Sequence, residues 1–264
     1  MEGVETKPFC TKCIYLICRM RILWIVYKLY FGFIFYGTLV LLYPAFHFLT
    51  GKRKYWPAAV KLEKFWGQMI MALTFVRLRA VGKENFPEPP FVVVSNHASY
   101  IDTVLMYGIV PGNFAFIGKG ELLNWPLFAR FFRSGLNIPV FRQSLKNAAQ
   151  AMDLADQRIK DDWSIAIFPE GGILPEAPRI APFRNGAFSL AIQNGVPVVP
   201  VLMANSYKIF ESLDLFATSG RPGVARIRIL EPIQTTELSD ADIITLRERV
   251  RNTIIKAQTE YEDR

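Results

Sequence analysis

The sequence predicts an α/β fold, in which a mixed, mainly parallel sheet is flanked by helices and preceded by an N-terminal membrane-associated helical segment. Three observations predict it. From about residue 77 onward, short apolar runs alternate with helix-length segments, which is typical of parallel sheets with helical crossovers. The 264 residues suffice for one substantial domain and an appendage. Hydrophobic residues make up 51% of the chain, and their excess lies near the N-terminus.

The N-terminal segment, residues 1–76, is predicted to anchor the protein to a membrane as a helical hairpin. No charged residue occurs from 29 to 49, a stretch that as a helix covers roughly 30 Å, about one bilayer core. Pro44 is expected to break this run, and residues 60–76 follow with apolar side chains at helical spacing. Basic residues flank the run on both sides, whereas a single span usually has asymmetric flanks. A hairpin in one leaflet and a true span therefore both fit the sequence.

Residues 77–264 are predicted to form the α/β domain. Its strands are expected at 75–81, 91–94, 114–117, 136–140, 165–168 and 196–203. A helix over 146–160 has apolar residues on one face, and residues 224–230 alternate like a half-exposed antiparallel strand. The chain should close with a helix over 241–258 that Ser239 caps.

Charge and cysteine content narrow the classes of partner. The net charge of +8 and the pI near 9.4 indicate acidic partners. No clustered basic stripe is present, so we expect anionic lipid headgroups and a phosphorylated substrate rather than nucleic acid. Cys10, Cys13 and Cys18 form only half of a zinc site, and reduced thiols beside a membrane are the main interpretation. Palmitoylation and a redox pair are the alternatives.

A histidine precedes an aspartate by five residues in the run Asn96-His97-Ala98-Ser99-Tyr100-Ile101-Asp102. The run follows a predicted strand, and the carboxyl ends of parallel strands face the ligand crevice of an open α/β sheet. A helix that begins at Ser99 or Asp102 would turn the carboxylate back toward the imidazole. Imidazole takes up a proton near neutral pH once a carboxylate fixes its tautomer. The alternative is a core histidine beside a helix cap.

A second cluster, Phe168-Pro169-Glu170-Gly171-Gly172, follows another predicted strand at the same sheet edge. A carboxylate there could bind a polyol hydroxyl, and the glycines would let backbone amides approach a ligand. The alternative is an ordinary turn with an exposed acid. The chain has no Gly-x-Ser-x-Gly elbow, and two histidines without a second cysteine pair argue against a metal site.

Together these clusters resemble the glycerolipid acyltransferase family, typified by lysophosphatidic acid acyltransferases. Residues 96–102 look like its catalytic His-x4-Asp block, and 118–142 are similar to its second block, which ends in an arginine. Residues 168–171 resemble the third block and 196–201 the fourth. The likeness, with the lead-in at 81–87, spans roughly residues 75–235, and four blocks in order are more specific than any single one.

The resemblance implies a role for each matched residue. His97 would be the general base and Asp102 would orient it. Backbone amides near Gly118 or Gly171 would stabilise the oxyanion. The residues implied in binding the acceptor are Lys119 and Arg142 for its phosphate, Glu170 for its glycerol, and Gly171 and Gly172 beside them.

The third block departs from the family, which usually continues Gly-Thr-Arg where this chain has Gly172 and Ile173. The missing arginine commonly helps to hold the acceptor phosphate in that family. Arg184, or else Arg179, is expected to take over this role; otherwise the acceptor is a different lysolipid.

The resemblance implies a membrane-bound enzyme that transfers a fatty acyl group from acyl-CoA or acyl-ACP to a lysophospholipid hydroxyl. The first candidate acceptor is 1-acyl-glycerol-3-phosphate, which would give phosphatidic acid. No cofactor is expected. The expected partners are the bilayer, the lysophospholipid and, for an acyl-ACP donor, acyl carrier protein. The site is expected at the cytoplasmic face of the inner or plasma membrane. The acyl chain is expected to contact Leu122, Leu123, Trp125, Leu127, Phe128, Phe131 and Phe132.

Three alternatives stay open. The first is acylation of a lyso-aminolipid. The second is a metal-dependent phosphoesterase with His97, Asp102 and Glu170 as ligands. The third is a non-catalytic lipid-binding protein.

Overall fold

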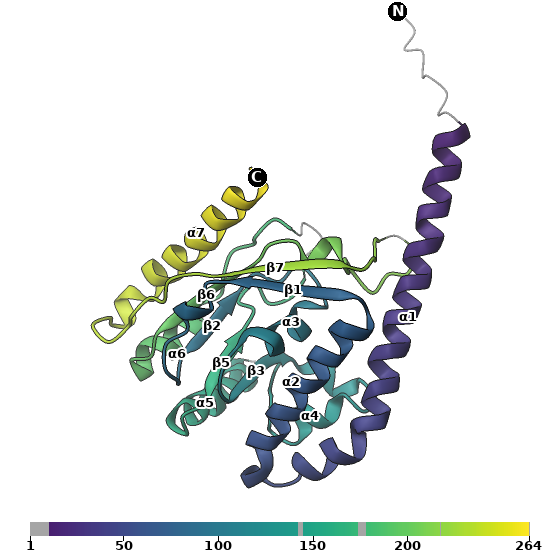
Figure 1. The fold of residues 1–264 in the computed structure, drawn as a ribbon. Coiled ribbons are helices and arrows are strands. Elements are labelled where there is room, and N and C mark those ends of the chain that lie inside the picture. The colour runs from purple at the N-terminus through teal and green to yellow at the C-terminus, as the bar shows by residue number, and fades with distance from the viewer. Residues whose placement is uncertain (1–10, 142–144, 174–177, 217, 264) are drawn as a thin grey trace, which may run out of the picture.

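A seven-stranded sheet forms the centre of the protein (Figure 1). The computed structural model describes residues 11–141, 145–173, 178–216 and 218–263, without the side chains of residues 11–19 and 145. The strand order is β1-β7-β6-β2-β5-β3-β4. The strands are β1 Val76–Val81, β2 Val92–Ser95, β3 Phe114–Lys119, β4 Ile138–Val140, β5 Ser164–Ile167, β6 Val198–Met203 and β7 Gly223–Ile229.

The pairing of the strands confirms the mixed, mainly parallel sheet. Among the described strands only β6 and β7 pair antiparallel, and β7 is in turn parallel to the edge strand β1. β2 lies between β5 and β6, and its Val92, Val93 and Val94 are fully buried because helices cover both faces of the sheet. The loop that follows β2 therefore leaves the sheet near its middle.

Helices cover the two faces of the sheet. On one face, α5 Leu145–Lys160, α6 Gly186–Asn194 and α7 Ile243–Glu262 pack side by side. On the other, α2 Trp56–Leu73 and α3 Asp102–Ile109 pack together and against β1. Apart from the N-terminal helix, the other helical segments are α4 Ala129–Arg133 and the 3-10 turns η1 Arg53–Tyr55, η2 Lys83–Asn85, η3 Gly120–Asn124, η4 Ser206–Lys208 and η5 Asp240–Asp242. Ser239 caps η5 through a capping box with Asp242, immediately before α7.

The expectation that Pro44 breaks the N-terminal helix is wrong. α1 runs from Thr11 to Leu49 as one helix with Pro44 inside it. Leu39 and Phe46, on either side of the proline, are fully buried, so packing holds both halves of the helix in line despite the backbone hydrogen bond that a proline forfeits. The chain instead reverses at η1, and α2 runs back along α1 (Figure 1).

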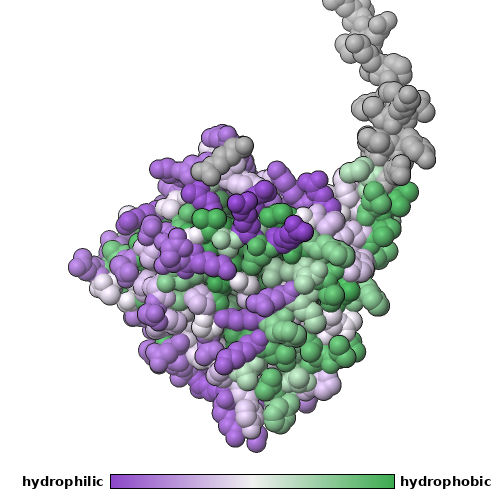
Figure 2. Space-filling model, in the orientation of Figure 1, coloured by the Kyte–Doolittle hydropathy of each residue, from purple (hydrophilic) through white to green (hydrophobic). Residues whose placement is uncertain are grey.

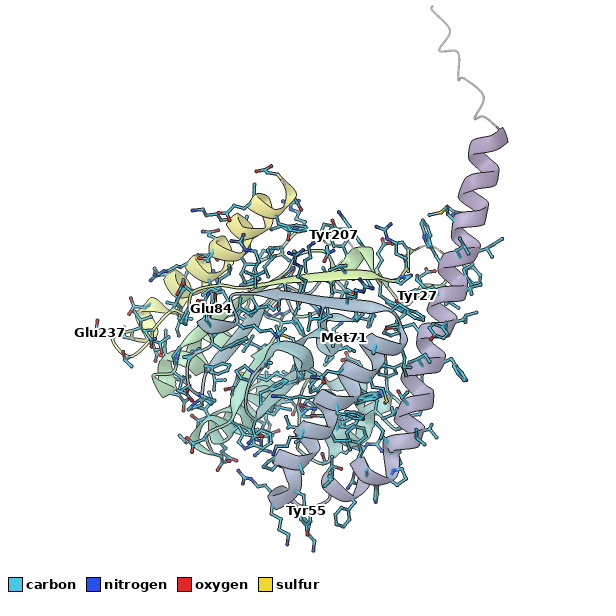
Figure 3. The ribbon with its side chains drawn as sticks, in the orientation of Figure 1. Tyr27, Tyr55, Met71, Glu84, Tyr207 and Glu237 are labelled. Carbon is cyan, nitrogen blue, oxygen red and sulfur yellow. The ribbon has the colours of Figure 1, made fainter. Side chains whose placement is uncertain are left out.

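The hairpin of α1 and α2 shares the hydrophobic core of the sheet. Phe46 packs edge-on against Phe131, and Trp66 stacks on the same ring. Where the end of α2 meets β1, the Tyr27 hydroxyl donates to the Thr74 carbonyl at 3.0 Å (Figure 3). The inner side of the hairpin is therefore continuous with the α/β core.

The outer side of α1 is an exposed apolar surface. Phe33 and Leu41 are each 74% exposed, and Phe48 is 64% exposed. Hydrophobic residues gather along this helix in the space-filling view (Figure 2). By length and composition, Met20–Leu49 could cross a membrane. Apolar area of this extent on a helix surface is typical of a segment that contacts lipid.

Candidate active site

His97 and Asp102 meet as their spacing predicts. α3 begins at Asp102, one turn after His97 leaves β2, and the Asp102 Oδ2 atom lies 2.9 Å from His97 Nδ1. The same oxygen accepts the backbone N–H groups of Ala98 and Ser99, each at 2.8 Å. Because an ionised carboxylate can only accept, Nδ1 carries the proton and the lone pair lies on His97 Nε2. The arrangement provides an oriented base.

The imidazole is also held by an aromatic neighbour. The ring of Phe168, which directly follows β5, stacks on His97 with centroids 4.1 Å apart and planes tilted by 15°. The His97 side chain is 16% exposed, whereas that of Asp102 is completely buried. One side of the ring pair therefore faces a cavity that His97 and Phe168 both line.

Glu170 binds the protein backbone in this structure. Its Oε1 atom accepts the His97 backbone N–H at 2.7 Å, and its Oε2 accepts the Ala181 N–H at 2.9 Å. Burial raises the pKa of the Glu170 carboxyl, and the two backbone hydrogen bonds counteract this rise. Glu170 thus connects the loop that carries His97 with the loop after β5. The glycerol-binding role expected for it stays a prediction.

Lys119, Gly171 and Gly172 line the same cavity as His97. Lys119 ends β3, and its ammonium approaches Gly172 so closely that a Cβ built there would lie 2.8 Å from Nζ. The Gly171 N–H, one expected oxyanion donor, instead donates to the Phe168 carbonyl at 3.0 Å because the chain turns there with Gly171 at a φ of +90°. The buried Gly172 N–H has no hydrogen-bond partner among the described residues.

The basic residues that were expected to bind the acceptor phosphate do not all lie at this cavity. Arg142 lies outside the described residues. Arg179 and Arg184 are exposed and do not line the cavity that contains His97. Ile173 does line it. Of the described cations assigned to the acceptor, the structure places Lys119 in the cavity that His97 lines.

The cavity beside His97 has a volume of about 510 Å³ and mainly apolar walls. It runs between α1, α2, α3 and the segment from η3 to α4, and is lined by Phe35, Trp66, Ile70 and Phe116 among others. Of the residues expected to contact an acyl chain, Leu122, Trp125, Phe128 and Phe132 line it. Leu123, Leu127 and Phe131 do not, and Phe131 is instead a core residue with 1% exposure.

Lys28 is a residue of this site that its sequence pattern does not indicate. Its side chain lies in the cavity wall, and its ammonium donates to the carbonyls of Asp214 and Thr218. It thereby fixes α1 to the loop between β6 and β7. In the sequence, Lys28 stands out because it is the last positively charged residue before the uncharged run.

A buried polar cluster at the cavity wall was also missed. Tyr107 and Asn137 line the cavity, and both hydrogen-bond Glu63 of α2, with Asn137 Nδ2 3.4 Å from Oε1. Glu63 is 2% exposed, and its Oε2 atom has no partner among the described residues. Burial raises the pKa of Glu63 to about 8. At neutral pH this carboxyl is therefore largely protonated.

Glu63 should make folding stability depend on pH. Its pKa rises from 4.5 to about 8 on folding, so its contribution is complete below 4.5 and declines as the pH rises toward 8. Glu63→Gln cannot ionise, so its melting temperature should fall less between about pH 5 and pH 8.5 than that of the wild type. Glu84→Gln, at an exposed acid (Figure 3), is the matched control and should keep the wild-type slope. Parallel slopes for the wild type and Glu63→Gln would contradict the assignment.

Comparison with known proteins shows which proteins this chain is similar to. The acyltransferase family model matches residues 77–204. Over 184 residues the chain is 33% identical to the 1-acyl-sn-glycerol-3-phosphate acyltransferase alpha of Ovis aries, covering 68% of this chain and 62% of the relative. The human alpha enzyme is also 33% identical over 184 residues, with 68% of this chain and 63% of that protein covered. The chain thus spans somewhat less than two thirds of these relatives.

The fold is similar to a solved structure over nearly its full length. The crystal structure of the 1-acyl-sn-glycerophosphate acyltransferase PlsC from Thermotoga maritima superposes with a TM-score of 0.74 at 28% identity. The match covers 93% of this chain and 99% of that one. The similarity therefore includes most of α1 and α2 as well as the sheet.

Proposed function

The chain belongs to the glycerolipid acyltransferase family, and on this premise we propose that it acylates the free hydroxyl of a lysophospholipid. The donor is an acyl thioester, and the preferred acceptor is 1-acyl-glycerol-3-phosphate, giving phosphatidic acid. The observation that carries the proposal is the His97–Asp102 pair at an apolar cavity of about 510 Å³.

The geometry supports direct transfer. His97 Nε2 takes the proton from the acceptor hydroxyl while that oxygen attacks the thioester carbonyl. Asp102 stabilises the imidazolium that forms, and collapse of the tetrahedral intermediate expels the thiolate, which recovers the proton from His97. The Gly172 N–H, which has no partner among the described residues, and the Lys119 ammonium lie close together in the cavity that His97 lines, and they are our candidates for stabilising the oxyanion. No covalent acyl-enzyme is required.

The exposed apolar face of α1 fits substrates that reside in a bilayer. A lysolipid chain gains about 0.8 kcal/mol per buried methylene, so an enzyme that works at the interface avoids extracting it. The cavity lies directly behind α1, whose Phe31 and Phe35 form part of its wall. We place the site at the cytoplasmic side, because thioester donors are intracellular.

A direct assay tests the proposal. The purified protein in detergent or vesicles receives labelled acyl-CoA and a panel of lysolipids, and mass spectrometry identifies the product. We expect phosphatidic acid from 1-acyl-glycerol-3-phosphate, with activity that survives a chelator. Release of inorganic phosphate without acyl transfer would instead favour a phosphoesterase, and no turnover of any lysolipid a lipid-binding protein.

One observation favours a second acceptor class. Ile173 lines the cavity at the position where the resembled family usually has an arginine, and Arg179 and Arg184 lie away from it. A lyso-aminolipid, which lacks a phosphomonoester, would need no such arginine. If the protein preferred a lyso-aminolipid in the same panel, the main product would be the acylated aminolipid and not phosphatidic acid.

A substitution of Glu170 distinguishes a role in positioning His97 from a role in binding the glycerol of the acceptor. Glu170→Gln keeps the size of the side chain but replaces one acceptor of a buried N–H with a donor, a change that costs about 1–3 kcal/mol. If Glu170 positions His97, kcat should fall by about tenfold to a hundredfold with little change in the acceptor KM. A rise in acceptor KM at constant kcat would support the glycerol-binding role instead.

A further inference from the structure

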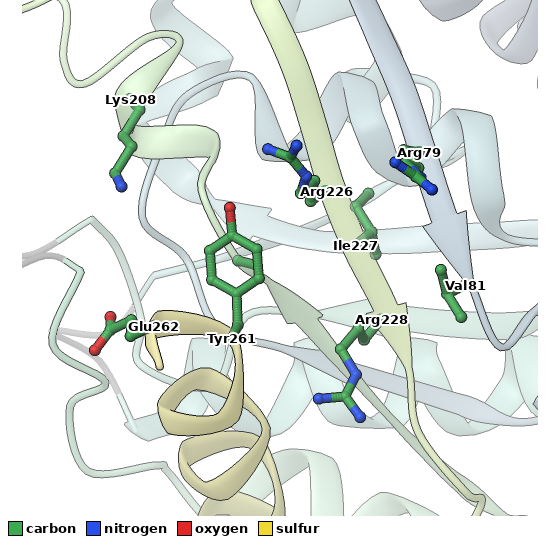
Figure 4. A pocket seen from close by; sticks show the side chains of 9 residues that line it. Arg79, Val81, Lys208, Arg226, Ile227, Arg228, Tyr261 and Glu262 are labelled. Atoms are coloured by element: carbon green, nitrogen blue, oxygen red, sulfur yellow. The ribbon is translucent and has the colours of Figure 1, made fainter. Parts of the chain in front are cut away.

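A second concave surface lies on the sheet face that carries α7. This basic groove, of about 770 Å³, lies between β1, β7, η4 and the end of α7 and is lined by Arg79, Lys208, Arg226, Arg228, Tyr261 and Glu262 (Figure 4). It shares no lining residue with the cavity beside His97. The mechanism above makes no use of it.

The charges in the basic groove are unbalanced. The sheet register places Arg79 directly opposite Arg226, and like charges at opposed positions of neighbouring strands are destabilising. Arg228 forms an ion pair with Glu260 at 2.9 Å. Within the described residues, Arg79, Arg226 and Lys208 have no carboxylate within ion-pair distance. This arrangement suits a ligand with several negative charges.

The basic groove begins near the catalytic edge of the sheet. The Arg226 carbonyl accepts the Ala204 N–H at 3.0 Å, just beyond the end of β6. Met203, the last residue of β6, exchanges hydrogen bonds of 2.8 and 3.1 Å with the side chain of Asn96, the neighbour of His97. Two adjoining strand ends therefore connect the groove with the loop that carries His97.

We propose that the basic groove binds the phosphorylated nucleotide end of a coenzyme A thioester. The arginines and Lys208 contact its diphosphate and 3′-phosphate, and the Tyr261 ring provides a surface for the adenine. A concave site of this volume that one aromatic ring lines fits a nucleotide better than the broad surface of a carrier protein. The inference rests on the proposed acyl transfer and specifies its donor.

The kinetic test compares two donors that differ only in the nucleotide. With Arg79→Gln/Arg226→Gln, the KM for acyl-CoA should rise at least about tenfold and depend less on salt. The KM for the same acyl group on pantetheine, and the KM for the acceptor, should not change. Arg249→Gln, at an exposed arginine of α7 outside the groove, is the matched control and should behave as wild type. Equal effects on both donors, or none, would overturn the proposal.

A binding measurement separates this proposal from the enzymatic one. Calorimetry with adenosine 3′,5′-diphosphate should show binding to the wild type and to Arg249→Gln but not to the double variant, whether or not the protein turns over lipid. Absence of binding to the wild type would overturn the groove assignment alone, whereas binding without any acyl transfer would overturn the proposed function. A different result is that the double variant loses binding to vesicles that contain phosphatidylglycerol while it still binds adenosine 3′,5′-diphosphate. That result would make the groove a lipid-headgroup site and contradict the proposal.

Discussion

His97→Ala is expected to lower acyl transfer by about 10²–10⁴-fold, the usual contribution of a general base. The reason is geometric: Nδ1 is tied to the buried Asp102, so only Nε2 remains to accept the proton of the acceptor hydroxyl. The loss should appear in kcat, because the imidazole acts in the transition state and little of the binding surface is removed. Initial rates at saturating donor and acceptor measure it.

Two controls make this loss interpretable. His47→Ala removes the other histidine of the chain, which is exposed on α1, and should leave kcat unchanged. His97→Ala should keep the melting temperature close to wild type, because the backbone N–H of residue 97 still donates to Glu170. Near-normal turnover by a folded His97→Ala protein would contradict the mechanism.

Local patterns predicted that the side chains of His97 and Asp102 could meet. A strand, a short turn and a helix that starts at Asp102 are all encoded within a dozen residues, so the contact with His97 follows from spacing. Most strands were placed within one or two residues for the same reason, since their apolar runs are bounded by Pro and Gly.

Contacts between distant segments could not be predicted in this way. Glu170 and the His97 amide are separated by 73 residues, and only the pairing of β2 with β5 brings them together. Glu63 lies on a helix whose pattern indicates only an apolar face, so its burial against Tyr107 and Asn137 is a tertiary effect. Pro44 is the opposite case, because packing overrides a strong local signal.

The basic groove also depends on contacts between segments that are distant in the sequence. Arg79 and Arg226 are separated by almost 150 positions, and each alone resembles a charged residue on an exposed strand face. Only the parallel pairing of β1 with β7 places them side by side. A sequence can show an excess of positive charge, but the strand order decides where the charge accumulates.

Asp102→Asn is expected to lower kcat by about 10²–10⁴-fold while the protein stays folded. The Asp102 Oδ2 atom accepts three N–H groups, at 2.8, 2.8 and 2.9 Å, and the amide oxygen of an asparagine can occupy the same position. The backbone of the loop would thus be retained. What disappears is the negative charge that stabilises the imidazolium.

Asp102→Ala distinguishes the charge from the loop geometry. The alanine variant also removes the acceptor of the Ala98 and Ser99 N–H groups, and each buried donor left unpaired costs about 1–3 kcal/mol. Its melting temperature should therefore fall well below that of Asp102→Asn, although both lose comparable turnover. If Asp102→Asn turned over normally and only Asp102→Ala were inactive, the carboxylate would be a loop-ordering group and His97 would act without an anionic partner.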